Sequence, residues 1–185
     1  GRLEAVRFSD GRCVDCDYLA CGFGLVPNTE LAALLGCELA DGFVQVDELQ
    51  HTSRSGHFAV GELTGIGGLD KALIEGEIAG LVAAGRLREA GRFGSRRRRS
   101  FRFTAALRQA FTLRPELKLL SRSDTVVCRC EDVSFSGLAR YASSLDAKLQ
   151  TRCGMGPCQG RICGGATRFL YGWDEGSTRP PLFPA

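Results

Sequence analysis

Histidine is nearly absent from this sequence. Only His51 and His57 occur among 185 residues, and no serine and carboxylate around them form a nucleophile–base set. Both histidines also lie far from the cysteine-rich part of the chain, which argues against a mixed Cys/His metal site there. We therefore expect no catalytic residue on this chain, and any metal site has to be built from other side chains.

Long apolar runs, a secretory signal and strong charge of one sign are also missing. No segment approaches the ~20 apolar residues that a membrane helix needs, and the formal net charge is only +3. The chain opens without a signal peptide, and its single methionine is Met155. We expect a cytoplasmic protein without an integral membrane segment, and we interpret the chain as the C-terminal portion of a longer polypeptide.

Cysteine, in contrast, is abundant: nine residues, five of them in "VVCRCEDVS" and "TRCGMGPCQGRICGG". In an extended segment Cys128 and Cys130 point to the same side, about 6–7 Å apart. Cys158 and Cys163 have a spacing that also occurs between ligands of plant-type iron–sulfur loops. The odd count and the clustering favour metal ligation in a reducing compartment over a disulfide scaffold.

Glycine and arginine surround these cysteines. Gly154 and Gly156 let the backbone fold tightly and aim N–H groups at sulfur, and Pro157 predicts the start of a helix whose amides favour an anionic cluster. We predict an iron–sulfur site held by Cys128, Cys130, Cys158 and Cys163, with Cys153 as the spare thiol.

Two alternatives stay open for these cysteines. Structural zinc sites use pairs with two to four intervening residues, so the single residue between Cys128 and Cys130 disfavours zinc. Five packed thiols without a metal are the other alternative. Elsewhere, the pair Cys13 and Cys16 precedes no helix that would lower a thiol pKa, and we interpret both as ordinary packing or surface thiols.

The pattern of apolar residues predicts a mixed α/β chain. We expect strands over 3–8, 17–24, 42–46 and 57–60, with a hairpin turn at Asp10-Gly11, and a short helix from Asn28 or Thr29 to Gly36. A long helix over 69–90 carries small residues on one face, at Ala72, Gly76, Gly80 and Ala84. This face predicts close packing of the helix on a strand or a ligand.

The segment 91–100, with two glycines and four consecutive arginines, predicts a domain boundary. The arginines lack interleaved aromatic residues, so we expect a solvated helix face or a subunit contact and no nucleic acid. The expected organisation is a region of strands and a long helix over 1–90, a basic linker and helix over 91–123, a cysteine-bearing domain over 124–172 and an extended tail over 173–185.

Both cysteine motifs resemble the bacterioferritin-associated-ferredoxin-like 2Fe–2S module. This module occurs near the C-terminus of the α-type subunits of opine oxidases, hydrogen cyanide synthase and related FAD-dependent amino-acid dehydrogenases. The segments "CGFGLVPNTELAALLGCEL" and "VQVDELQHTSRSGHFAVGELTGIGGLDKALIEGEIAG" resemble the same flavoproteins. The implied fold is the C-terminal part of a two-dinucleotide-domain flavoprotein, followed by a small, mainly helical 2Fe–2S domain.

The resemblance also implies how FAD would be bound. In the family, the acidic residue after a Val-Gly pair bonds the ribityl chain, which points to Glu62 after Gly61. The helix that follows directs its N-terminus at the flavin, which points to the backbone near Lys71 and Ala72. The N-terminal G-x-G-x-x-G turn of such enzymes is missing, because "GFGLVP" ends in proline.

The function implied by the resemblance is electron transfer. We expect a FAD and 2Fe–2S subunit of a heteromeric oxidoreductase, in which a β-type, FAD-containing dehydrogenase subunit oxidises a small amine or amino acid such as an opine, proline or glycine. The alternative from another class is a non-enzymatic zinc-binding interaction module with a basic helix.

Overall fold

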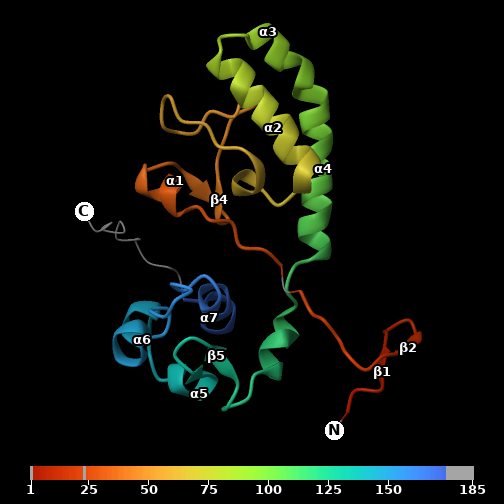
Figure 1. The fold of residues 1–185 in the computed structure, drawn as a ribbon, viewed down its shortest axis with the longest axis vertical. Helices are drawn as coiled ribbons and strands as arrows, with labels where there is room; N and C mark the ends of the chain where they lie inside the picture. The colour runs from red at the N-terminus through yellow and green to blue at the C-terminus, as the bar shows by residue number, and fades with distance from the viewer. Residues whose placement is uncertain (1, 23, 174–185) are drawn as a thin grey trace.

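The structure of the chain is a computed structural model that describes residues 2–22 and 24–173 (Figure 1). Apart from Trp173, the expected tail over 173–185 lies outside the described residues. The described part is mixed α and β, as expected, but its strands form three separate two-stranded pairs. Helices α2, α3 and α4 lie together, and α5, α6 and α7 form a second group at the other end.

The chain begins with the expected hairpin. Strand β1 (Ala5–Arg7) pairs antiparallel with β2 (Cys13–Asp15). Gly11 has a φ of +87° in the turn between them, a conformation that glycine adopts at little cost. The prediction of a turn at Asp10-Gly11 is confirmed.

The buried strand expected over 17–24 is not formed. Residues 17–22 and Gly24 are exposed and belong to no strand, and the Tyr18 side chain is 91% accessible. An apolar segment becomes a strand only when another strand accepts and donates its backbone hydrogen bonds. No described segment pairs with it, so the sequence-based prediction is wrong here.

A compact layer of short elements follows. Helix α1 (Glu30–Leu34) begins after Thr29, as predicted. Strand β3 (Leu39–Ala40) pairs with β4 (Phe43–Val44), whereas the expected strand over 57–60 contributes only a bridge between Phe58 and His51. A small core of buried residues closes this layer: Cys37, Val44 and Ala59.

The long helix expected over 69–90 is divided. Helix α2 (Gly68–Ala83) ends before Gly85, whose φ of +74° interrupts the helix, and α3 (Leu87–Ala90) is separate. Helix α2 buries Ile74, Ile78 and Val82 rather than its small-residue face. A Cβ at Gly76 or Gly80 would meet nothing within 4 Å, so no described strand packs on this face at the two glycines, and close packing on a ligand stays a prediction.

The arginine run is helical rather than a break. After the 3-10 helix η2 (Gly91–Phe93), helix α4 (Gly94–Ala110) includes all four arginines and packs along α2. Arg97 is buried and donates to the Asp47 carbonyl at 2.9 Å. The buried Gln50 amide is oriented so that its nitrogen donates to the Ala59 carbonyl at 3.0 Å and its oxygen accepts from Arg97 Nε at 2.7 Å. The other three arginines of the run are exposed on the helix, as expected for a solvated face, and Arg97 is the exception.

The last third of the described chain is built around cysteine. After the 3-10 helix η3 (Pro115–Leu120), strand β5 (Val126–Cys128) pairs with β6 (Val133–Ser134), followed by α5 (Phe135–Leu138), α6 (Ser144–Thr151) and α7 (Cys163–Tyr171). Their shared core is formed by the following buried residues: Val127, Cys128, Val133, Leu138, Ala147, Cys153, Cys163 and Trp173. Across residues 2–22 and 24–173, no helix has both the length and the apolar character needed to cross a bilayer.

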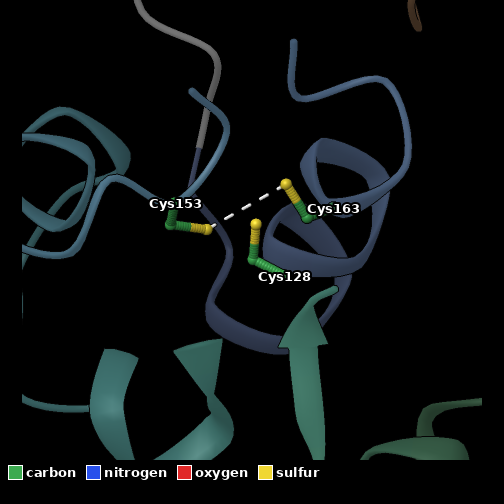
Figure 2. Close-up of side chains that lie close together, drawn as sticks. All are labelled: Cys128, Cys153 and Cys163. Carbon is green, nitrogen blue, oxygen red and sulfur yellow. Dashed lines mark hydrogen bonds between the residues drawn. The ribbon is translucent and has the colours of Figure 1, made fainter. Parts of the chain in front are cut away.

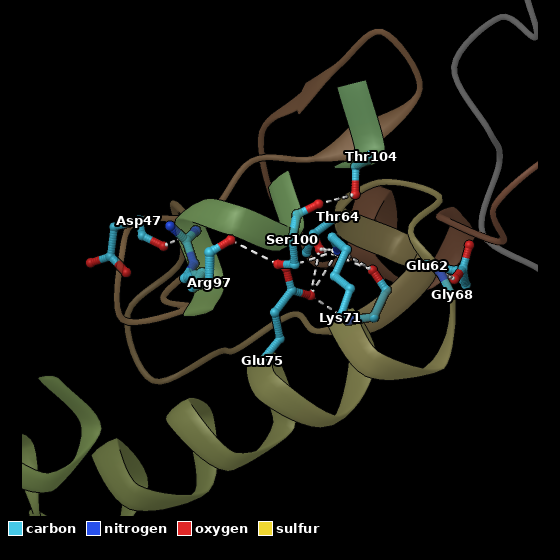
Figure 3. A network of polar contacts seen from close by, with 10 residues as sticks. Asp47, Glu62, Thr64, Gly68, Lys71, Glu75, Arg97, Ser100 and Thr104 are labelled. Carbon is cyan, nitrogen blue, oxygen red and sulfur yellow. Dashed lines mark hydrogen bonds and ion pairs between the residues drawn. The ribbon is translucent and has the colours of Figure 1, made fainter. Parts of the chain in front are cut away.

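A buried ion pair fixes the turn before α2 (Figure 3). Lys71 is 1% and Glu75 0% exposed, and Lys71 Nζ lies 2.8 Å from Glu75 Oε1. Lys71 Nζ also donates to the Gly61 carbonyl at 2.9 Å and to Thr64 Oγ1 at 2.6 Å. Glu75 Oε2 accepts from the Gly61 N–H at 2.7 Å and from the Thr64 hydroxyl at 2.8 Å. The pair therefore holds both ends of the 3-10 turn η1 (Gly61–Thr64).

Removing the carboxylate of this pair should be strongly destabilising. In Glu75→Ala the Lys71 ammonium stays buried without a counter-charge, and we expect a loss of about 3–5 kcal/mol in the free energy of unfolding. Urea denaturation followed by circular dichroism measures this loss. The matched control is Glu89→Ala, which removes the exposed pair between Arg86 and Glu89 and should leave the midpoint nearly unchanged. A Glu75→Ala variant as stable as this control would contradict the assigned role.

Candidate metal centre and cofactor-binding turn

Three cysteine sulfurs meet in the core of the last third of the chain (Figure 2). Cys128 ends β5, Cys153 follows α6, and Cys163 opens α7. Their Sγ atoms all lie within 4.8 Å of one another, and the Cys153 and Cys163 sulfurs are 4.0 Å apart. The three residues are 1%, 8% and 3% exposed, in the same order. We call them the inner trio.

The other two cysteines of the motifs lie nearer the surface. Cys130 is exposed and Cys158 half-buried, and each thiol shifts the pKa of the other. We call them the outer pair. The charge of Cys128 in the inner trio acts on Cys130, and the charge of Cys158 acts on Cys153. The two groups are therefore electrostatic neighbours that belong to one constellation of five thiols.

Backbone N–H groups are directed at one sulfur of each group. Burial opposes ionisation of Cys128, but backbone hydrogen bonds from Gly154 and Glu131 outweigh it and lower the pKa of this thiol. The pKa of Cys158 is also lowered, first by the backbone of Ile162 and then by its hydrogen bond with Cys130. One thiolate in each group is thus stabilised before any metal binds, as metal ligation requires.

The remaining thiols favour the protonated state. Burial, followed by the charge of Cys128, raises the pKa of Cys153 to about 11. Burial and the neighbouring thiols raise the pKa of Cys163 as well. For Cys130, a backbone hydrogen bond from Cys158 lowers the pKa, but the side-chain hydrogen bond and charge of Cys158 outweigh it and the net shift is upward. A positive ion would reverse this preference, because it would replace mutual repulsion of thiolates by attraction.

Glycine makes the close approach of the two cysteine segments possible. A Cβ on Gly156 would lie 2.3 Å from Cys130 Cβ and 3.3 Å from its Sγ, so no larger residue fits there without displacement. The predicted helix start at Pro157 is wrong: residues 157–162 form turns, and α7 begins at Cys163. Positive φ angles at Gln159 and Gly160 keep the backbone out of the helical region until that point.

The structure brings all four predicted ligands into this constellation, though not in the pairs that their spacing suggested. Cys128 lies with Cys163, and Cys130 lies with Cys158. Cys153, predicted as a spare, stands inside the inner trio. Its position follows from the end of α6, where Arg152 adopts a left-handed conformation with φ of +62° and turns the chain back toward the core.

A second candidate site lies at the turn η1. Glu62 Oε1 accepts from the Gly68 N–H at 2.8 Å and thereby joins this turn to the start of α2 (Figure 3). Its other oxygen, Oε2, is buried without a hydrogen-bond partner among the described residues. A buried carboxylate oxygen is costly unless a donor reaches it. This oxygen fits a hydroxyl group of a bound ligand.

The other residues predicted to bind the cofactor, Gly61, Lys71 and Ala72, make contacts within the protein. The Gly61 N–H and carbonyl are both used by Glu75 and Lys71, and the Lys71 side chain points into the same buried network. Ala72 backs the turn, because its methyl group would lie 3.4 Å from a Cβ on Gly61. Sequence reasoning missed Glu75, although its position four residues after Lys71 on one helix is the spacing of an ion pair.

The pKa pattern predicts the order in which thiols react in metal-free protein. Cys158 should be alkylated by iodoacetamide before Cys130 at neutral pH, although Cys130 is more exposed, because the lowered pKa of Cys158 gives more thiolate. Cys153 and Cys163 should react last. Peptide mapping by mass spectrometry after short exposures measures the order, and faster labelling of Cys130 than of Cys158 would contradict the electrostatics described here.

Comparison with protein families gives a match over the first half of the chain. Residues 1–92 match the model of the pyridine nucleotide-disulphide oxidoreductase family, whose range ends just before α4. The matched range includes the turn η1, the buried ion pair and Glu62. No solved structure matches the chain at a significant level.

Curated relatives extend over most of the chain. Hydrogen cyanide synthase subunit HcnB of Pseudomonas aeruginosa is 34% identical over 83% of this chain and 37% of its own length. An opine oxidase subunit of Agrobacterium tumefaciens is 29% identical, over 96% of this chain and 40% of its own length. An opine oxidase subunit of Rhizobium meliloti is 33% identical, over 87% of this chain and 41% of its own length. The chain thus spans about two fifths of these relatives.

These findings confirm the resemblance to hydrogen cyanide synthase and opine oxidase subunits. They do not test the 2Fe–2S module, which stays a prediction at this point. Residues 1–92 thus match the pyridine nucleotide-disulphide oxidoreductase family, and most of the chain is similar to subunits of hydrogen cyanide synthase and opine oxidase.

Proposed function

We propose that this chain is part of an electron-transfer subunit of a heteromeric oxidoreductase, with a 2Fe–2S cluster on its cysteines and FAD at the turn η1. The observation that carries the proposal is the convergence of three buried thiols, Cys128, Cys153 and Cys163, whose sulfurs lie within 4.8 Å of one another. Relatives are named as opine oxidase subunits, and residues 1–92 match an oxidoreductase family, which supports a redox role over a structural one.

The donor set fits a cluster. Four thiolate ligands hold a 2Fe–2S cluster, and the proposed ligands are Cys128, Cys130, Cys158 and Cys163. Backbone N–H groups directed at Cys128 and Cys158 would stabilise the negative charge of the ligands. Zinc would accept the same sulfur atoms, so the identity of the metal is the first question for experiment. We also propose a cytoplasmic location, because nine cysteines without a disulfide fit a reducing compartment.

The turn η1 fits FAD through Glu62. Its buried, unpartnered Oε2 would accept from a hydroxyl of the ribityl chain, while Oε1 stays bonded to Gly68. The pair Lys71 and Glu75 would keep the turn in place. Together, a flavin and a 2Fe–2S cluster would convert electron pairs into single electrons.

The relatives also support the presence of a partner. Since they are named as one subunit each of hydrogen cyanide synthase and opine oxidase, we propose that this chain works with a β-type, FAD-containing dehydrogenase subunit. That partner would oxidise a small amine or amino acid of the opine, proline or glycine type. The chain itself would relay electrons and take no part in substrate binding.

Protein purified anaerobically should be brown and should contain iron and acid-labile sulfide in equal amounts. Reduction with dithionite should give a low-temperature EPR signal. Cys158→Ala should abolish cluster content, because Cys158 is one of the four proposed ligands and the outer pair holds no further thiol that could replace it. The matched control is Cys37→Ala, which removes a buried cysteine from a different core and should leave cluster content unchanged. A colourless protein with stoichiometric zinc would overturn the proposal in favour of a zinc-binding module.

Flavin binding should depend on the second oxygen of Glu62. Glu62→Gln keeps the size of the side chain but replaces one carboxylate acceptor by an amide donor. We expect a loss of about 1.5–3 kcal/mol in FAD binding, which is roughly a tenfold to hundredfold increase in Kd. Fluorescence titration with FAD measures it, with Glu48→Gln on the exposed surface as control. Equal affinities for both variants would remove Glu62 from the site.

A further inference from the structure

The inner trio contains one thiol more than a cluster needs. A 2Fe–2S cluster with four cysteine ligands places two of them on each iron. The outer pair, Cys130 and Cys158, supplies two thiols and has no reserve, whereas Cys128, Cys153 and Cys163 offer three for the two remaining positions. The surplus thiol is therefore confined to the inner trio.

Burial alone does not explain Cys153. A packed cysteine needs only apolar neighbours, but the Cys153 sulfur faces the two other sulfurs of the trio (Figure 2). It donates to Cys163 Sγ at 4.0 Å, and no pair of sulfurs in the trio is more than 4.8 Å apart. A metal ion between these sulfurs would therefore be within reach of Cys153 as well as of Cys163.

The trio is not symmetrical. Cys128 ends strand β5 and pairs with Val133 of β6, so its backbone is held in a strand pair. Cys153 follows α6 and Cys163 opens α7, and their two sulfurs are 4.0 Å apart. Cys128 is therefore the constant member, and the other two compete for one position.

We propose that Cys153 is a reserve ligand of the iron–sulfur centre, interchangeable with Cys163. This inference rests on the proposed function. Whichever of the two thiols coordinates iron releases its proton to solvent, and the other keeps its own. Since both sulfurs belong to one small cluster, a change of ligand needs only local side-chain movement. The centre would then survive the loss of either thiol through oxidation or substitution.

The test is the iron and sulfide content of anaerobically purified variants, with the EPR signal after dithionite as a second readout. Cys153→Ala and Cys163→Ala should each keep most of the wild-type iron and sulfide. Cys163→Ala should show shifted g-values, because Cys153 would replace its ligand. The double variant should lose the cluster as completely as Cys158→Ala, which has no reserve. Alanine is chosen because a serine oxygen could itself bind iron.

Two results would overturn the inference while the proposed function stands. One is a Cys163→Ala variant that is folded by circular dichroism yet as empty of iron as Cys158→Ala. The other is a double variant that keeps the wild-type cluster, which would exclude both thiols as ligands. If Cys163→Ala fails to fold, Cys163→Val repeats the comparison with a side chain that fills the core and offers iron no ligand atom. Wild-type protein without iron and sulfide would instead contradict the proposed function itself.

Discussion

The structure depends on how the backbone places charge-stabilising groups around sulfur. Thiolates that lie close together repel one another, and burial in a small core increases the cost of ionising them. The chain offsets this cost at one cysteine in each group, where N–H groups of the preceding and following turns reach Cys128 and Cys158. The remaining thiols stay protonated until a cation arrives. This division prepares the site for a metal and keeps the metal-free core from accumulating negative charge.

At the second site, the turn η1, a charged side chain is also held in place by contacts with the backbone, and here a buried ion pair makes them. A carboxylate aimed at a cofactor has to be held still, and the turn η1 is too short to hold Glu62 by itself. The buried pair of Lys71 and Glu75 binds the N–H and the carbonyl of Gly61, next to the residue that would meet the ligand. The contact between Lys71 and the Phe101 ring of α4, 5.3 Å away, links this turn to the basic helix. A helix outside the matched family range thus supports the turn inside it.

Local features could be read from the sequence, and long-range ones could not. Glycine and cysteine spacing pointed to the hairpin turn at Gly11 and to the cysteine-rich region, because both depend on a few consecutive residues. The spacing did not show that Cys128 pairs with Cys163 or that Cys153 joins them, because these contacts depend on where α6 and α7 end and begin. The burial of Arg97 also depends on distant partners, Asp47 and Gln50. The strand expected over 17–24 failed for the same reason, since its apolar pattern carries no information about a pairing strand.

The account as a whole requires that one centre binds both cysteine motifs. X-ray absorption spectroscopy at the iron edge tests this most directly in anaerobically purified protein. We predict a first shell made only of sulfur and a second scatterer from a neighbouring iron, both absent from a variant that lacks Cys130 and Cys158. An iron edge without a neighbouring iron, or a zinc edge with an all-sulfur shell in its place, would contradict the electron-relay centre described here.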